Sequence, residues 1–240
     1  MTTIAIIQAR MGSSRFPGKI MKELNEKPIL QHIVDFLKHS KMIGKIVIAT
    51  TDLQEDDVVD SFAKKLKIDC FRGSSENVLE RFYKCAKKFN ADLIIRLTSD
   101  NPLVNPKIID NLINLCKNSH CDYASNCLHL TYPYGYSTCE IFTFSTLTKL
   151  YETQKDPQSL EHVTYFITKN PNLFNIQEIN APKNLSRPSW KLSVDTIEDY
   201  IIMQKIFSSL YQENSFIDYP TLVEFLDRNN QIIKSDQNDN

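Results

Sequence analysis

The 240-residue sequence has almost no net charge, because 28 Lys and Arg residues are offset by 29 Asp and Glu residues and leave a formal charge of −1. Such a chain has no overall positive field to hold a polyanion, so general nucleic-acid binding is disfavoured and only a local basic pocket is compatible with it. The sequence also lacks any apolar run near the roughly 20 residues that cross a bilayer. No basic segment precedes the first apolar stretch, which Arg10 interrupts, so this start predicts a first strand rather than a signal peptide.

Metal-binding and disulfide patterns are also missing. Six cysteines are present, but none forms a C-x-x-C pair, and no histidine stands at the spacing of a zinc site. This pattern predicts reduced, partly buried thiols in a cytoplasmic protein rather than a disulfide framework. The share of hydrophobic residues, 42%, and of charged residues, 24%, is ordinary for a globular chain and excludes collagenous, coiled-coil and wholly disordered proteins.

The first half of the sequence alternates between short β-rich runs and amphipathic helices. We expect strands at 4–8, 45–50, 68–71 and 92–97, and helices at 28–39, 54–66, 75–89 and 106–116. This alternation predicts βαβ units and a mostly parallel sheet.

After residue 120 the pattern loosens, although the element types can still be assigned. We expect strands at 123–125, 139–144 and 191–194, an extended run at 173–179, and helices at 145–151, 159–168, 196–210 and 219–229. No internal repeat or linker interrupts the chain, so we predict one domain over 1–230 and a disordered polar tail at 231–240.

The loop after the first strand carries the strongest chemical signal. Its glycine and serines let backbone N–H groups turn toward an anion, and its three cations together suit a triphosphate. The residues concerned are Arg10, Gly12, Ser13, Ser14, Arg15 and Lys19. The loop matches neither G-x-x-x-x-G-K-[ST] nor G-x-G-x-x-G, which excludes Walker-type and dinucleotide-binding loops. A solvated basic turn is the alternative.

The pattern Ala9-Arg10-x-x-Ser13-x-Arg15-x-Pro17-Gly18-Lys19 resembles the signature loop of the CMP-sugar cytidylyltransferases, which include the enzymes that activate 3-deoxy-manno-octulosonate and the acylneuraminates. The run from Ile7 to Arg15 is similar to the branch named after the spore coat polysaccharide biosynthesis protein SpsF. This resemblance covers residues 4–210. It implies a single Rossmann-like nucleotide-diphospho-sugar transferase domain of three αβα layers around a mostly parallel, mixed sheet.

The resemblance also implies an activity. CMP would pass from CTP to a sugar, with a sugar acid as the leading acceptor, and pyrophosphate would leave, for surface polysaccharide or glycan biosynthesis. The loop from Ala9 to Lys19 would bind the nucleotide, and Arg10, Lys19 and Asp100 would be catalytic.

Two carboxylates stand where a metal ion would be needed. Asp100 and Asp195 each follow a predicted strand, so both are expected at the edge of the sheet that carries the phosphate loop. Family members hold their metal with an Asp in each of these motifs, and Mg²⁺ bound by one or two carboxylates plus substrate phosphates would neutralise the reacting phosphate. The alternatives are a helix N-cap for Asp195 and a turn residue for Asp100.

Further site residues come from the resemblance alone. Arg72 and Ser74 match the segment that lines the nucleobase pocket, with an N-capping turn as the alternative. Arg96 replaces a family glutamine and could meet a substrate carboxylate or phosphate. Glu140 and His162 match motifs near the acceptor sugar, although we expect His162 to be packed beside Phe166 rather than to contact the substrate.

Partners and competing functions follow from the same comparison. Related enzymes are commonly dimers, and the tyrosine-rich loop 132–136 could form either a sugar-facing wall or a dimer contact. No nucleic acid or membrane is expected as a partner.

A glycosyltransferase of the same broad fold is one competing function. It would hold its metal with a D-x-D motif after a central strand, but the strand at 92–97 is followed by Thr98-Ser99-Asp100-Asn101. A non-catalytic binding protein is the third possibility.

Overall fold

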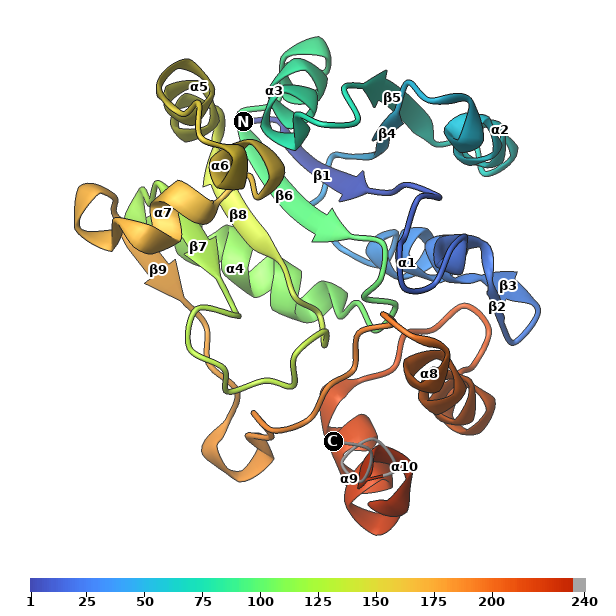
Figure 1. Ribbon diagram of the computed structural model, residues 1–240. Coiled ribbons are helices and arrows are strands. Elements are labelled where there is room, and N and C mark those ends of the chain that lie inside the picture. The colour runs from blue at the N-terminus through green and yellow to red at the C-terminus, as the bar shows by residue number, and fades with distance from the viewer. Residues whose placement is uncertain (235–240) are drawn as a thin grey trace.

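A mixed sheet of seven strands forms the centre of the computed structural model, which describes residues 1–234 (Figure 1). The strand order is β5-β4-β1-β6-β8-β7-β9, and within this sheet only β8 runs antiparallel to its neighbours. The strands are β1 (Thr3–Gln8), β4 (Lys45–Thr51), β5 (Asp69–Gly73), β6 (Leu93–Thr98), β7 (Tyr123–Ser125), β8 (Glu140–Thr143) and β9 (Ile176–Glu178). Two short strands, β2 (Glu23–Leu24) and β3 (Lys27–Pro28), form a separate hairpin. The predicted α/β fold with a mostly parallel sheet is confirmed.

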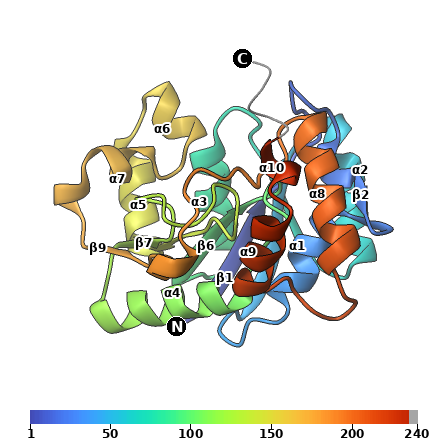
Figure 2. The same cartoon turned by 90° about the horizontal axis from the view of Figure 1, so that it is seen from below.

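Helices cover both faces of the sheet and produce three layers (Figures 1 and 2). One face packs against α1 (Ile29–Leu37), α2 (Asp57–Lys65), α4 (Pro106–Ser119), α8 (Ile197–Leu210) and α9 (Tyr219–Arg228). The other packs against α3 (Val78–Lys88), α5 (Phe144–Thr153) and α7 (Tyr165–Lys169), with α6 (Pro157–Glu161) beside α3. Short 3₁₀ turns are η1 (Lys19–Met21), η2 (Gln54–Asp56), η3 (Pro171–Leu173) and η4 (Lys183–Leu185).

The central strand shows why the sequence requires two helical layers. Successive side chains of a strand point to opposite faces of its sheet. In β1, Ile4 and Ile6 enter the core on the α3 side, whereas Ala5 and Ile7 enter the core on the α1 side. All four side chains are fully buried, so both faces need an apolar cover.

The parallel strands end at a common edge, and this edge positions the functional loops. Gln8, the last residue of β1, pairs with Ala49 of β4 and Thr98 of β6. The loops that leave these strands therefore start side by side, where α/β proteins bind their ligands.

Residues 191–194 do not form the strand that was predicted. Lys191 makes one isolated parallel bridge to Tyr134, and the following residues bond to two different loops. Leu192 N–H donates to the Tyr134 carbonyl at 2.7 Å, and Val194 N–H donates to the Asp100 carbonyl at 2.8 Å. The segment alternates polar and apolar residues as a strand would, but no neighbouring strand offers it a ladder.

Two further segments are organised differently from the prediction. The helix expected at 159–168 is divided into α6 and α7, because the backbone leaves helical geometry at His162 (φ −108°, ψ 90°). The chain also remains helical beyond residue 230, where α10 (Gln231–Lys234) forms because Ile232 and Ile233 pack against the core. The first four residues of the predicted tail are thus part of the fold, and 235–240 lie outside the described residues.

The prediction that all cysteines are reduced is wrong for one pair. Cys116 and Cys121 form a disulfide, with their Cα atoms 4.9 Å apart. The left-handed conformation of His120 (φ 49°) ends α4 and reverses the chain, so Cys121 returns to the last turn of that helix. The other four cysteines are free thiols. Among the described residues, no helix has the length and apolar character needed to cross a membrane.

Candidate active site

A cleft of about 430 Å³ opens at the edge of the sheet where β1 and β6 end. Its walls come from the loop after β1, the turn after β6, the loop around Tyr134 and the end of α6. Asp195, two residues before the start of α8, closes the remaining side. The predicted site residues that line it are Arg10, Gly12, Ser13, Ser14, Arg15, Lys19, Arg96, Asp100, His162 and Asp195. The structure therefore brings together residues that are nearly 190 positions apart in the sequence.

The loop after β1 is folded back on itself by its own backbone. The Met11 carbonyl accepts hydrogen bonds from Ser13 N–H at 2.8 Å and Gly18 N–H at 3.0 Å. The Met11 N–H donates to the Asp56 carboxylate at 2.7 Å, which ties the loop to η2. Gly18 has a φ of 67°, a left-handed conformation that glycine adopts at little cost, and it starts the turn that carries Lys19.

Lys19 joins the two predicted metal ligands. Its ammonium donates to Asp100 Oδ2 at 3.1 Å, to Asp195 Oδ1 at 3.3 Å and to the Val194 carbonyl at 2.7 Å. Only 11% of the lysine side chain is exposed. Both carboxylates thus lie against the same cation, next to the glycine-containing loop.

Asp195 is held in place by the loop that contains Gly135. A Cβ at Gly135, whose φ is 88°, would lie 2.3 Å from the Ser193 nitrogen, so only glycine allows this close approach. Ser193 then donates its hydroxyl to Asp195 Oδ2 at 3.0 Å. Burial acts to raise the pKa of Asp195, but Lys19, Ser193 and Lys191 together hold it below its ordinary value. The carboxylate is therefore charged at neutral pH.

The N-cap of α8 is Thr196, which removes the alternative interpretation of Asp195. The Thr196 side chain accepts from Asp199 N–H, and the Asp199 carboxylate accepts from Thr196 N–H, which together form a capping box. The Asp195 carboxylate does not cap the helix and faces the cleft.

Replacement of Thr196 by alanine is expected to lower the free energy of unfolding by about 1 kcal/mol, because the first turn of α8 loses its side-chain acceptor. Urea unfolding measures this change. Ser208→Ala, at an exposed position on the same helix, is the control and should lower it by no more than about 0.5 kcal/mol. Equal stability of the Thr196 variant and the wild-type protein would contradict the assignment of the cap.

The oxygen atoms around Lys19 suit a magnesium ion. Two carboxylate oxygens and one carbonyl oxygen converge on its ammonium, and hard oxygen donors are the ligands that Mg²⁺ prefers. Within residues 1–234, no three His, Cys, Asp or Glu side chains are grouped to hold a metal. An ion here would accordingly bind two carboxylates and complete its shell with substrate phosphates and water.

Arg96 and Glu140 form a nearly buried ion pair at the wall of the cleft. Arg96 Nη1 donates to Glu140 Oε2, and Arg96 Nη2 donates to Gln8 Oε1 at 3.3 Å. The other carboxylate oxygen of Glu140 accepts from the hydroxyls of Tyr123, at 2.7 Å, and Thr164, at 2.5 Å. Burial acts to raise the pKa of Glu140, but Arg96 and these hydroxyls keep it below its ordinary value. Arg96 reaches the cleft, whereas Glu140 does not line it.

His162 is exposed on the wall of the cleft, so the expectation of a packed core histidine is wrong. It terminates α6 and lies beside Glu161, which also lines the cleft.

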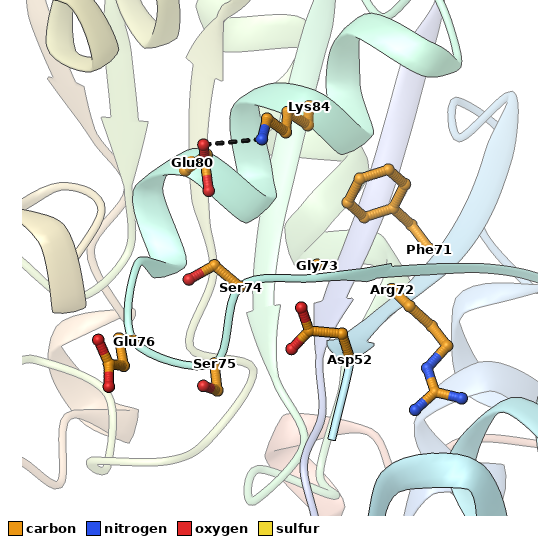
Figure 3. Close-up of a pocket in the computed structure, with 9 residues that line it drawn as sticks. All are labelled: Asp52, Phe71, Arg72, Gly73, Ser74, Ser75, Glu76, Glu80 and Lys84. Atoms are coloured by element: carbon orange, nitrogen blue, oxygen red, sulfur yellow. Dashed lines mark ion pairs between the residues drawn. The ribbon is translucent and has the colours of Figure 1, made fainter. Parts of the chain in front are cut away.

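Arg72 and Ser74 lie outside the main cleft, in an adjoining cavity of about 370 Å³. Figure 3 shows the Arg72 side chain directed away from Ser74, and its partners lie at the end of β4, in the turn that follows and at the start of α2. It donates to the carbonyls of Thr51 and Leu53 and pairs with Asp57. Ser74 lines this cavity. A smaller cavity shares Ser75 and Glu76 with this one and shares Arg10 and Glu161 with the cleft. Ala9 is buried and lines none of these three cavities.

Arg81 is a buried charged residue next to the Ser74 segment that was not expected from the sequence. Its side chain is fully buried on α3, and its Nη1 donates to the Ser74 carbonyl. Burial, and then the charge of Arg10, lowers the pKa of Arg81 to about 10. An arginine among the apolar positions of this helix (78, 79, 82, 85 and 86) was the available signal. Tyr134, from the loop expected at a sugar-facing wall or a dimer contact, also lines the cleft. The other lining residues were not assigned to it: Gln8, Ile20, Thr98, Ser99, Asn101, Thr138 and Glu161.

Residues 4–236 match a family described as cytidylyltransferase. The chain is 35% identical over 233 residues to the spore coat polysaccharide biosynthesis protein SpsF of Bacillus subtilis, which covers 93% of each chain. It is 37% identical over 126 residues to 3-deoxy-manno-octulosonate cytidylyltransferase of Thermodesulfovibrio yellowstonii, about half of each chain.

A solved structure described as a cytidylyltransferase from Leptospira borgpetersenii superposes with a TM-score of 0.90 at 34% identity, covering 100% of this chain and 98% of that one. The matched region includes every element that builds the cleft. The chain therefore belongs to the cytidylyltransferase family, in the branch that includes SpsF.

Proposed function

We propose that this cytidylyltransferase transfers CMP from CTP to a sugar acid, with release of pyrophosphate, in the synthesis of a surface polysaccharide or another glycan. The observation that carries the proposal is the meeting of Asp100 and Asp195 on Lys19, at the rim formed by the glycine-containing loop. The name of the octulosonate relative supports an acidic sugar, and that of SpsF supports a polysaccharide pathway.

The loop after β1 offers unused donors to the triphosphate. Among the described residues, the backbone N–H groups of Gly12 and Ser14 and the Arg10 guanidinium donate to no protein acceptor. Backbone N–H groups that turn into a concave loop bind anions, and guanidinium forks bind phosphate oxygens in pairs. Arg10 also borders the smaller cavity lined by Ser75 and Glu76, so a nucleotide can extend from the cleft toward the segment that follows Ser74.

The reaction needs positioning and charge neutralisation more than proton transfer. A sugar hydroxyl oxygen attacks the α-phosphorus of CTP, the bond from that phosphorus to the β-bridging oxygen breaks, and the hydroxyl proton leaves to solvent or a nearby base. Arg10, Arg15 and Lys19 would neutralise the charge that grows on the departing pyrophosphate. Mg²⁺, held by Asp100 and Asp195, would withdraw charge from the phosphates and orient them.

The acceptor would lie on the side of the cleft formed by Arg96, Tyr134 and His162. The homodimer and the cytoplasmic location remain predictions.

A screen of pyrophosphate release tests the proposal. Each of the four ribonucleoside triphosphates is combined with Mg²⁺ and, in turn, with 3-deoxy-manno-octulosonate, N-acetylneuraminate, other sugar acids and a set of sugar 1-phosphates. We expect pyrophosphate with CTP and a sugar acid, together with the CMP-sugar mass. Turnover of CTP with sugar phosphates alone would contradict the sugar-acid acceptor, and nucleotide binding without any pyrophosphate would contradict catalysis.

A further inference from the structure

The ammonium group of Lys19 has no free donor in this structure. An ammonium group carries three N–H donors. Lys19 places one on Asp100, one on Asp195 and one on the Val194 carbonyl, at 3.1, 3.3 and 2.7 Å. Lys19 therefore cannot donate to a phosphate in this arrangement unless it gives up a protein partner.

Lys19 also stands where the oxygen donors for a metal converge. The same two carboxylates that fit Mg²⁺ are neutralised here by the lysine, and Asp195 Oδ1 carries a second cation, Arg15, at 3.1 Å. Two carboxylates next to each other repel, so a positive charge between them stabilises the cleft before any ligand enters. An ammonium and a divalent ion cannot occupy this position together.

The neighbouring cation behaves differently. Arg10 lines the same cleft but has no ion pair among residues 1–234, so it can meet a triphosphate without a rearrangement. The ammonium of Lys19 is carried by a flexible four-carbon side chain, so it can turn from the carboxylates to a nearby phosphate.

We propose that Lys19 is a built-in substitute for the metal ion, which holds Asp100 and Asp195 in the nucleotide-free enzyme and exchanges its partners when metal and nucleotide bind. This inference rests on the proposed function, since it assumes that these carboxylates bind Mg²⁺. Lys19 releases the two carboxylates to the incoming ion, and its ammonium moves to the phosphate oxygens of the nucleotide. The lysine thereby makes metal binding weak without nucleotide and strong with it.

Metal binding to the nucleotide-free protein tests the exchange, with no activity assay involved. Mn²⁺ serves as the probe, and the loss of its free electron paramagnetic resonance signal gives the dissociation constant. The variant is Lys19→Met, which keeps much of the side-chain length and removes the charge. We expect it to bind Mn²⁺ about tenfold or more tightly than the wild-type protein, because a site blocked in 90% of molecules loses about tenfold in apparent affinity.

Two controls separate the proposed exchange from a general change of charge. Lys22→Met removes the same charge from an exposed position three residues away and should leave Mn²⁺ affinity within about twofold of the wild type. Lys19→Arg retains a cation and should keep the affinity weak. An Mn²⁺ affinity of Lys19→Met that is equal to or below that of the wild type, or that Lys22→Met matches, would overturn the proposal.

Asn variants of the two carboxylates distinguish failure of the proposed metal site from failure of the proposed Lys19 exchange. If Asp100→Asn and Asp195→Asn weaken Mn²⁺ binding in the Lys19→Met background, the metal site stands. If Lys19→Met then binds Mn²⁺ no more tightly than the wild-type protein, only the proposed exchange of Lys19 for the metal ion is wrong. If the Asn changes have no effect in that background, the metal site of the proposed function is wrong as well, and the exchange with it.

Discussion

Asp100→Asn is expected to lower the turnover of CTP about a hundredfold or more, as the loss of one group that stabilises a developing charge does in other enzymes. The substitution keeps the shape of the side chain and removes the negative charge that pairs with Lys19 and fits a metal. Because the side chain is 30% exposed and lies in a surface turn, the free energy of unfolding should change by no more than about 1 kcal/mol. Pyrophosphate release with CTP, Mg²⁺ and the acceptor found in the screen measures turnover.

Asp35→Asn is a well-matched control for this change. Asp35 pairs with Lys38 at 3.0 Å and is 29% exposed, but it lies on α1, outside the cleft. Its variant should retain the wild-type rate. A normal rate in the Asp100 variant, with urea unfolding that shows both proteins folded, would rule out the proposed role of Asp100.

The first half of the fold could be predicted from the sequence because local and global signals agree there. Ile4 to Ile7 read as a strand buried on both faces, and the structure places alternate residues in two separate cores. Where such strands are parallel, the rule that ligands bind at their carboxyl ends also locates the loop at 9–19 and Asp100. Composition and periodicity therefore gave the position of the cleft before any geometry was known.

Asp195 was correctly predicted at the edge of the sheet that carries the phosphate loop, but the strand predicted before it does not form. The run before it alternates polar and apolar residues as a strand does, but whether such a run joins a sheet depends on a partner strand, which can come from any part of the chain. Here its neighbours are the Tyr134 loop and the Asp100 turn. The close contact at Gly135, far away in the sequence, could not be deduced from residues 191–194 themselves.

Arg81 and the Cys116–Cys121 disulfide show two other limits. A buried arginine is interpreted from sequence as a surface residue, because arginine is rarely fully buried in proteins. Its position behind the Ser74 carbonyl depends on how α3 packs against the sheet. The disulfide depends on the left-handed residue His120, which is a feature of the backbone that spacing alone does not reveal.

Glu140→Gln is expected to lower the free energy of unfolding by about 3 kcal/mol, because it leaves the Arg96 charge without its partner in a mostly buried place. The ion pair is 15% exposed at Arg96 and 10% at Glu140. Glutamine retains an oxygen that can accept from the Tyr123 and Thr164 hydroxyls, so the change isolates the lost charge. Urea unfolding of the variant and the wild-type protein gives the difference.

Two companion proteins distinguish a buried charge effect from the loss of any ion pair. Glu224→Gln breaks a glutamate–arginine pair on α9 that is 62% exposed at Glu224, and exposed pairs contribute only about 0–1 kcal/mol. Arg96→Met combined with Glu140→Gln leaves no charge behind and should recover most of the lost stability, as buried pairs exchanged for uncharged groups do. If Glu140→Gln costs no more than Glu224→Gln, the pair does not stabilise the fold. Arg96 would then be available to bind the acceptor sugar, and a lower affinity of Arg96→Met for that sugar would indicate this role.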